Sequence, residues 1–300
     1  MTIIQLEYLL SVANTGSFSE GAAQCFVTQP SLSVQIRNLE EELGVVLLDR
    51  TKKPVLPTEI GKVVIENARK ALRSFAYIKE SVNEARSEVA GTLRLGIIPT
   101  IAPYIIPDLL PIFSASYPKV ELEVVVMFAS EIVSELLKDG LDAAIVSSGT
   151  CPASLLEHEL VSDRFFAYLS PQHDLTERSS VRIEDVNAKE LLLLSERHCL
   201  REQVLELCHL RRNQHMAYNV HCDSLETLMR LVDTTPTMTI IPEMAVRALP
   251  AEKRSQVKTF AKGAASRKIS VVVRRTYVKK TIITALEKCI VEVCNSGKLN

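Results

Sequence analysis

The sequence has almost no net charge, few aromatic residues and no unbroken apolar run. Its 35 lysines and arginines oppose 36 aspartates and glutamates, which gives a formal net charge of −1. No global positive field therefore indicates a polyanionic partner. Four prolines interrupt the most apolar stretch, residues 95–113, whereas a membrane-spanning helix needs about 20 apolar residues without such breaks. We therefore expect no membrane association.

The sequence also lacks the cysteine patterns of disulfide frameworks and metal sites. Seven cysteines are present, an odd number that argues against a complete disulfide framework. None forms a CxxC pair, and no His/Cys cluster has zinc-finger spacing. Free thiols fit a reducing compartment, and the first residues show neither a basic segment nor a small-residue cleavage site. We expect a cytoplasmic protein without metal or cofactor.

Composition and patterning instead indicate a globular chain of several parts. The 300 residues, 47% hydrophobic and 24% charged, predict two domains at about 150 residues each. Residues 1–58 are typical of short helices that end in turn residues. A long helix is expected over 59–89. From residue 90, strand and helix patterns alternate, which predicts an α/β domain with a largely parallel sheet.

The long helix carries one narrow apolar stripe. Its members recur at alternating spacings of four and three residues: Val64, Ala68, Ala71, Phe75, Ile78, Val82, Ala85 and Val89. Such a two-residue seam suits a partner helix, so we favour dimerisation, with packing on the chain's own domain as the alternative.

Within the α/β region, the pattern predicts a regular set of elements. Strands are expected at 93–97, 120–127, 143–146, 165–169, 191–194, 239–241 and 269–273. Helices are expected at 101–115, 132–138, about 199–210, 225–232 and 281–293. The predicted helix 199–210 follows the apolar run 191–194 directly.

The N-terminal segment has the pattern of a helical hairpin that could read a DNA groove. Ser17 and Glu20 form a capping box for one helix, and Thr28 caps the next, with Pro30 in its first turn. Leu32, Ile36, Leu39 and Leu43 fall on one face of that second helix. The other faces present small hydroxyls, an amide and a guanidinium, which can bond to bases and phosphates. A plain helical hairpin with a solvated face is the alternative, and the excess of acidic residues in 1–58 mildly favours it.

Two cysteines form the second candidate site. Cys199 would lie in the first turn of its helix beside Arg197, His198 and Arg201, and both features favour the reactive thiolate. Cys208 lies nine residues later, a rise of about 13.5 Å along a helix, whereas a disulfide needs Cα atoms within about 7 Å. A bond between them would require local unfolding, which makes a switch. The alternative is that both are small core residues.

The run AAQCFVTQPSLSVQIRNLEEELGVVLLDR resembles the winged helix-turn-helix of LysR-type transcriptional regulators. The match comprises Ala22, Ala23, Thr28, Gln29, Pro30, Ser31, Leu32, Ser33, Ile36, Leu39, Glu40, Glu41, Leu43, Gly44 and Arg50; Leu48 departs from the usual phenylalanine. The resemblance implies DNA contacts by Thr28, Gln29, Pro30, Ser31, Ser33, Gln35, Arg37 and Arg50.

The same resemblance implies an α + α/β fold in three parts. These are a winged helix-turn-helix at 1–58, a dimerising linker helix at 59–89 and a two-lobed regulatory domain, similar to periplasmic binding proteins, at 90–300. Lobe I would comprise 90–162 and 267–300, and lobe II 163–266.

The segment HCLREQ, with a second cysteine, Cys208, five residues after its end, resembles the redox segment of peroxide-sensing members of this family. The resemblance implies that Cys199 is the peroxidatic thiol and Cys208 the resolving thiol. Thr100 would supply a hydroxyl to the peroxide, His198 and Arg201 would orient it and stabilise the thiolate, and Arg267 would be a further basic residue there. Three positions depart from the pattern: Arg197 for glycine, Glu202 for aspartate, and Ala129, followed by Ser130, for threonine.

The resemblance also implies a set of partners. These are promoter DNA of oxidative-stress defence genes, hydrogen peroxide as signal, a homodimer or homotetramer, RNA polymerase, and a thiol reductant such as glutaredoxin or thioredoxin. One alternative is a LysR-type metabolic regulator that binds a small organic anion between its lobes. Another is a thiol peroxidase, which would not explain the helix-turn-helix; we therefore expect a regulator rather than an enzyme.

Overall fold

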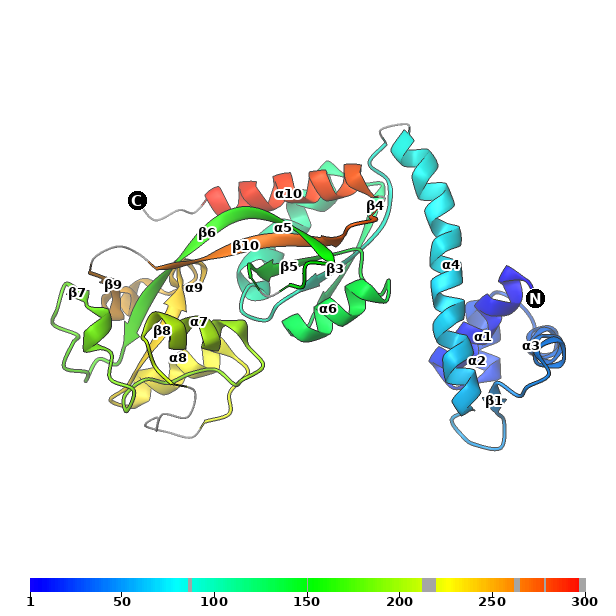
Figure 1. Ribbon diagram of the computed structural model, residues 1–300, viewed down its shortest axis with the longest axis horizontal. Helices are drawn as coiled ribbons and strands as arrows, with labels where there is room; N and C mark the ends of the chain where they lie inside the picture. The colour runs from blue at the N-terminus through cyan, green and yellow to red at the C-terminus, as the bar shows by residue number, and fades with distance from the viewer. Residues whose placement is uncertain (86–87, 150, 212–219, 262–264, 278, 297–300) are drawn as a thin grey trace. The chain divides into compact units, whose positions relative to one another are not determined.

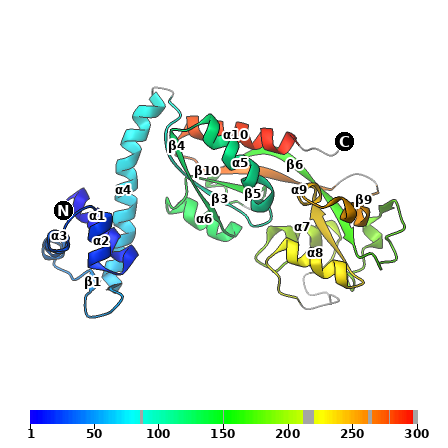
Figure 2. The same cartoon turned by 180° about the vertical axis from the view of Figure 1, so that it is seen from behind.

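The structure is a computed structural model that describes residues 1–85, 88–149, 151–211, 220–261, 265–277 and 279–296. The chain divides into two compact units, residues 1–82 and 83–300. Each unit is considered by itself below (Figures 1 and 2).

Three helices form the body of the first unit: α1 (Ile3–Thr15), α2 (Phe18–Gln24) and α3 (Gln29–Leu43). Thr2 and Gln5 form a capping box that begins α1, and Gly16 ends it at φ +67°, a left-handed conformation that favours glycine. Ser17 and Thr28 cap α2 and α3 as predicted, each accepting from the N–H three residues on; at α2 this is the Ser17 half of the expected capping box. Leu32, Ile36 and Leu39 of α3 are fully buried in a shared core, but Leu43 is exposed, contrary to prediction, because it is the last residue of the helix.

A small wing and a long helix complete this unit. β1 (Leu48–Asp49) and β2 (Leu56–Pro57) pair antiparallel, and α4 follows over Glu59–Ala85. Gly61 allows α4 to lie against β1, since a Cβ there would come within 2.0 Å of the Leu47 carbonyl oxygen. On the predicted apolar stripe, Ala68 packs into the core while Phe75, Ile78 and Val82 are exposed.

The second unit contains an eight-stranded mixed sheet. Its strands are β3 (Gly91–Ile97), β4 (Val120–Val126), β5 (Ala143–Ser147), β6 (Leu155–Leu169), β7 (Ser180–Val181), β8 (Met238–Pro242), β9 (Val257–Phe260) and β10 (Ser266–Arg274). The order is β4-β3-β5-β10-β6-β9-β7, with β8 also on β6. β3 pairs parallel with β4 and β5, but β10 pairs antiparallel with both β5 and β6. The largely parallel sheet that we predicted is therefore wrong, because the long β6 and β10 run in opposite directions.

The helices of the second unit cover two separate apolar cores. The first core contains α5 (Ala102–Ser116), α6 (Ala129–Leu137) and α10 (Lys280–Asn295); α5 and α10 lie on one face of the sheet and α6 on the other (Figures 1 and 2). The second contains α7 (Cys199–Leu207) and α8 (Leu225–Thr234). We call the parts around these cores lobe I and lobe II. β6 begins in the first core and ends in the second, which confirms the two-lobed fold. The short α9 (Glu243–Arg247) contributes to both cores.

Two local predictions in lobe II were wrong. Residues 191–194 are buried but form no strand, and only Leu191 makes an isolated bridge, with Met238. The Thr239 hydroxyl donates to the Leu192 carbonyl, and the Ser195 N–H donates to the Cys222 carbonyl. The backbone of this segment therefore forms hydrogen bonds that are not those of a regular β-ladder. Helix α7 ends at Leu207 rather than near Leu210, since His209 adopts a left-handed φ of +53°.

Candidate redox site and DNA-reading helix

Helix α3 presents the predicted DNA-contacting residues at its N-terminal half. Thr28, Gln29, Pro30, Ser31 and Arg37 are exposed, and Ser33 and Gln35 are half-buried. Arg50, on the wing, pairs with Glu40 at 2.7 Å and lies 5.0 Å from the Phe18 ring centre. Its guanidinium is thus held in place beside α3. The exposed helix start offers backbone N–H groups and hydroxyls suited to phosphates and base edges.

Helix α7 separates the two predicted redox thiols and places them in different cores. Cys199 is the first residue of α7 and packs against the core of lobe I. Cys208 follows the last residue of α7 and is buried in the core of lobe II. Both are free thiols, and nine residues of helix correspond to a rise of about 13.5 Å.

A buried ion pair joins the two long strands, close to Cys199. Arg267 on β10 is directly opposite Asp163 on β6, and its Nε donates to the Asp163 carboxylate at 2.9 Å. The two side chains are 0% and 1% exposed. Arg267 also donates two hydrogen bonds of 3.0 Å to Thr100, one to the hydroxyl and one to the carbonyl oxygen. This network fixes the Thr100 hydroxyl and places a cation near the Cys199 sulfur.

Two further polar atoms near Cys199 are buried without a hydrogen bond among the described residues. One is Nε2 of His198, which lies 3.5 Å from an Asp223 carboxylate oxygen. The other is Oε1 of Gln203, whose amide nitrogen donates to the Ser147 hydroxyl at 2.7 Å. Buried polar atoms usually have partners, so each of these two atoms could bond to a small polar molecule.

Burial and charge act in opposite directions on the Cys199 thiol. Burial raises its pKa above the ordinary value, while a hydrogen bond from its own backbone N–H and the charge of Arg267 lower it. This direction is opposite to the one expected from the helix start and the adjacent basic residues. The basic residues beside Cys199 in sequence do not supply this charge. Arg201 donates to the Leu194 carbonyl at 2.9 Å. Burial lowers the pKa of His198, which favours its neutral form.

Two residues of this site were missed from the sequence. Asp163 carries no motif of its own, although pairing β6 with β10 would have placed it opposite Arg267. Gln203 is the last residue of the HCLREQ segment, but no role was assigned to it. Arg197 was expected to favour the Cys199 thiolate and was noted as a departure from the family pattern; its guanidinium instead lies 3.7 Å from the Phe128 ring centre and pairs with Glu131 at 2.7 Å. Ala129, which replaces the expected threonine, is the first residue of α6 and packs on the lobe I core.

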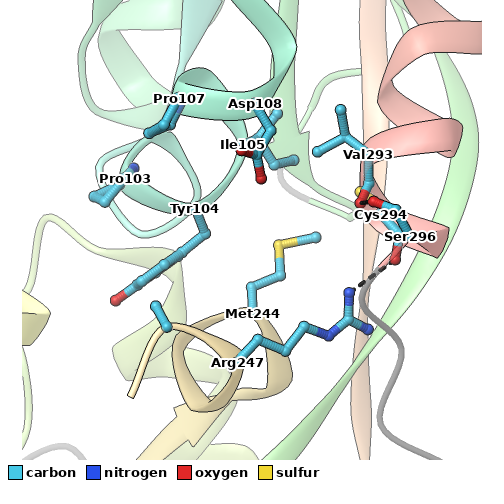
Figure 3. A pocket seen from close by; sticks show the side chains of 11 residues that line it. Pro103, Tyr104, Ile105, Pro107, Asp108, Met244, Arg247, Val293, Cys294 and Ser296 are labelled. Carbon is cyan, nitrogen blue, oxygen red and sulfur yellow. Dashed lines mark hydrogen bonds between the residues drawn. The ribbon is translucent and has the colours of Figure 1, made fainter. Parts of the chain in front are cut away.

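A separate pocket of about 340 Å³ lies between α5, α9 and α10 (Figure 3). Tyr104 and Met244 line it, together with Arg247, which donates to the Cys294 carbonyl and pairs with Glu243. Its one arginine is thus already engaged. Across the described residues, no group of three or more His, Cys, Asp or Glu side chains could hold a metal ion. In the same part of the chain, no helix is long and apolar enough to cross a membrane.

Comparison with known proteins agrees with this architecture. Residues 3–62 match the bacterial regulatory helix-turn-helix protein of the lysR family, and residues 86–295 match the LysR substrate binding domain. A hydrogen peroxide-inducible genes activator of Haemophilus influenzae is 34% identical over 249 residues, covering 82% of this chain and 81% of its own. The dual regulator OxyR of Escherichia coli K12 is 33% identical over 257 residues, covering 86% and 83%.

Solved structures of similar fold also include proteins named OxyR. A full-length OxyR variant from Pseudomonas aeruginosa has a TM-score of 0.76 and 30% identity, covering 97% of this chain and 98% of its own. A hydrogen peroxide-bound OxyR variant from Corynebacterium glutamicum has a TM-score of 0.66 and 26% identity, covering 99% and 93%. The chain therefore belongs to the LysR family of bacterial helix-turn-helix regulators, and within that family it is similar to the hydrogen peroxide-inducible genes activators.

Proposed function

We propose that this protein is a DNA-binding transcriptional regulator switched by hydrogen peroxide through a Cys199–Cys208 disulfide. The proposal rests on one observation above all: α7 holds the partly buried Cys199 against the lobe I core and Cys208 within the lobe II core. A bond between the two sulfurs must therefore rearrange the helix between them. A chemical event at one sulfur thus becomes a change of structure.

The chemistry requires two steps. The Cys199 thiolate attacks one oxygen of hydrogen peroxide, the O–O bond breaks, and hydroxide leaves as the sulfur becomes a sulfenic acid. The Cys208 thiol then gives up its proton as its sulfur attacks the sulfenic sulfur; the S–O bond breaks, and the leaving hydroxide takes that proton and departs as water as the disulfide forms. Peroxide is the oxidant in this scheme. A thiol reductant of the glutaredoxin or thioredoxin type returns both cysteines to thiols.

The buried polar groups suit the first step. The Thr100 hydroxyl and the Arg267 guanidinium can donate toward the peroxide, and the free Gln203 oxygen can accept from it. His198 contributes a neutral ring nitrogen, and Arg201 fixes the segment before α7 by its bond to Leu194. A positive charge beside the reacting sulfur stabilises the anion that attacks.

The DNA-reading residues complete the proposal. Thr28, Gln29, Pro30, Ser31, Ser33, Gln35, Arg37 and Arg50 would contact promoter DNA. Two chains would associate through the exposed part of the α4 stripe, with recognition helices in successive major grooves about one turn apart. Homotetramers and contact with RNA polymerase would follow from assembly on the promoter, at oxidative-stress defence genes.

The test is a peroxide titration of the reduced protein, with thiols mapped by mass spectrometry beside a DNA footprint. We expect one equivalent of hydrogen peroxide to give the Cys199–Cys208 disulfide and a changed footprint. Cys199→Ser should bind DNA with the reduced footprint at every peroxide concentration. Both thiols free after treatment would overturn the proposal.

Two other functions make different predictions in the same experiment. A metabolic regulator would ignore peroxide and be stabilised by a small organic acid. The buried cation Arg267 is already neutralised by Asp163, which does not favour a bound anion. A thiol peroxidase would consume many equivalents of peroxide per chain when a reductant is supplied.

A further inference from the structure

The residue before the His198–Cys199 pair connects the redox segment to the opposite lobe. Arg197 belongs to the segment that leads into α7, whereas Phe128 and Glu131 stand at the start of α6 in lobe I. The Arg197 guanidinium lies 3.7 Å from the centre of the Phe128 ring and donates to Glu131 at 2.7 Å. We call these three residues the α6 clamp.

The clamp is held in a defined geometry. One oxygen of Glu131 accepts from the Phe128 N–H at 3.0 Å, and the other accepts from Arg197. The carboxylate therefore fixes the guanidinium beside the same ring whose backbone it caps. The His198 ring also contacts Phe128, edge to face, with 5.0 Å between ring centres. Both residues that directly precede Cys199 thus contact the same phenylalanine of lobe I.

We propose that the α6 clamp holds the reduced conformation and controls how readily Cys199 leaves lobe I to meet Cys208. The inference rests on the disulfide switch proposed above and adds a regulatory residue to it. To join Cys208 in the lobe II core, Cys199 must move away from lobe I. Because Arg197 and His198 adjoin Cys199 in the chain, that movement breaks the contacts with Phe128 and Glu131.

The clamp acts on the second chemical step. Peroxide attack on Cys199 needs no movement of the backbone, so the clamp leaves the sulfenic acid step unchanged. Disulfide formation does need the backbone to move, so the clamp slows disulfide formation. The clamp also favours the dithiol form at equilibrium. Arg197 and Glu131 are 56% and 47% exposed, which makes their ion pair modest and sensitive to salt. Arg197 is a positioning residue in this scheme.

The test separates the two steps in the full-length protein. Rapid mixing with peroxide resolves the step whose rate depends on peroxide concentration from the later step that forms the disulfide. We expect Arg197→Ala to accelerate the later step about three- to tenfold, as loss of an exposed ion pair and a cation–π contact implies. The first step should change less than about twofold. In a glutathione redox buffer, the variant should also be oxidised at a lower ratio of disulfide to thiol.

Controls distinguish the clamp from a general loss of stability. Arg178→Ala removes another exposed arginine of lobe II, paired with Asp185 at 2.9 Å, and should change neither step. Arg197→Lys keeps a charge for Glu131 but not the planar stacking, so its rate should fall between those of wild type and Arg197→Ala. Salt at about 1 M should accelerate the later step of wild type more than that of Arg197→Ala.

The possible failures are distinct. If wild type forms no Cys199–Cys208 disulfide, both the proposed function and the clamp are wrong. If wild type forms it and Arg197→Ala forms it at the same rate, only the clamp is wrong. Equal acceleration of both steps would also contradict the clamp, because it would show a loosened site rather than a released contact.

Discussion

Cys199 and Cys208 lie at opposite ends of α7, one against the lobe I core and the other within the lobe II core. Because of this separation, the disulfide can form only if α7 refolds. An oxidant needs only the Cys199 sulfur for the first step, but the second step cannot proceed while the helix stays intact. The buried ion pair and the polar groups near Cys199 assist the reaction with peroxide in the first step. The packing of α7 determines how readily the disulfide forms in the second step.

The raised pKa of Cys199 predicts a strong dependence of oxidation on pH. Because only the thiolate attacks peroxide, the rate should rise about tenfold per unit between pH 6 and 8, where the thiol form predominates. Stopped-flow rates of the peroxide-dependent step across this range test the prediction. A rate already constant from pH 6 upward would show instead that the thiolate predominates throughout, as we expected from the sequence alone.

Burial of Cys208 should lower stability in alkali. Burial raises the pKa of its thiol to about 12, so from about pH 9 upward the unfolded chain loses this proton while the folded chain retains it. The folded state then binds more protons, and stability must fall as pH rises, by at most about 1.4 kcal/mol per unit from this group. Urea unfolding at pH 8 to 10 should show a shallower decline for Cys208→Ala than for wild type. Identical slopes would contradict this account.

The Asp163–Arg267 pair should be essential for the regulatory domain. Asp163→Ala leaves a buried guanidinium without its carboxylate, which costs about 3–5 kcal/mol of unfolding free energy. Glu159→Ala is a matched control on the same strand, since Glu159 pairs with Lys268 at 3.7 Å on the surface and such pairs contribute at most about 1 kcal/mol. Chemical unfolding of both variants gives the comparison. Equal losses would mean that the buried pair has no special role.

The exposed part of the α4 stripe should hold two chains together. Ile78 is 63% exposed, so a change there leaves the core of one chain intact. Ile78→Glu would place a charge in the seam of a dimer and should shift sedimentation toward monomer, with weaker binding to a two-half-site promoter. Ile78→Leu keeps an apolar side chain and should sediment as wild type. If Ile78→Glu still sediments as a dimer, the interface between the two chains lies elsewhere.

Much of this molecule could be predicted from sequence because its patterns are local. The caps at Ser17 and Thr28 depend on residues within one helical turn, and most helices and strands lie close to where their periodicity placed them. The resemblance to LysR-type regulators is confirmed, and so is the two-lobed α/β fold. The strand expected at 191–194 failed because an apolar run shows only that the segment is buried, not which partners its backbone bonds to.

The site was harder to predict because it is assembled across the chain. Asp163 and Arg267 meet only when β6 and β10 pair in this register, and Thr100 reaches Arg267 from a distant part of the chain; no short motif shows these pairings. The expectation of a thiolate used neighbours in sequence alone: Arg197 and Arg201 are near Cys199 in sequence, but their guanidinium groups bond to Glu131 and to the Leu194 carbonyl. Burial is a property of the whole fold, and at Cys199 it outweighs the local charge.

Hydrogen exchange over residues 199–207, measured before and after one equivalent of peroxide, tests the central claim most directly when the disulfide is mapped in the same sample. The account predicts slow exchange of the α7 amides in the dithiol form and its loss in the fraction that carries the Cys199–Cys208 bond. A mapped Cys199–Cys208 bond with the α7 amides still protected would contradict it.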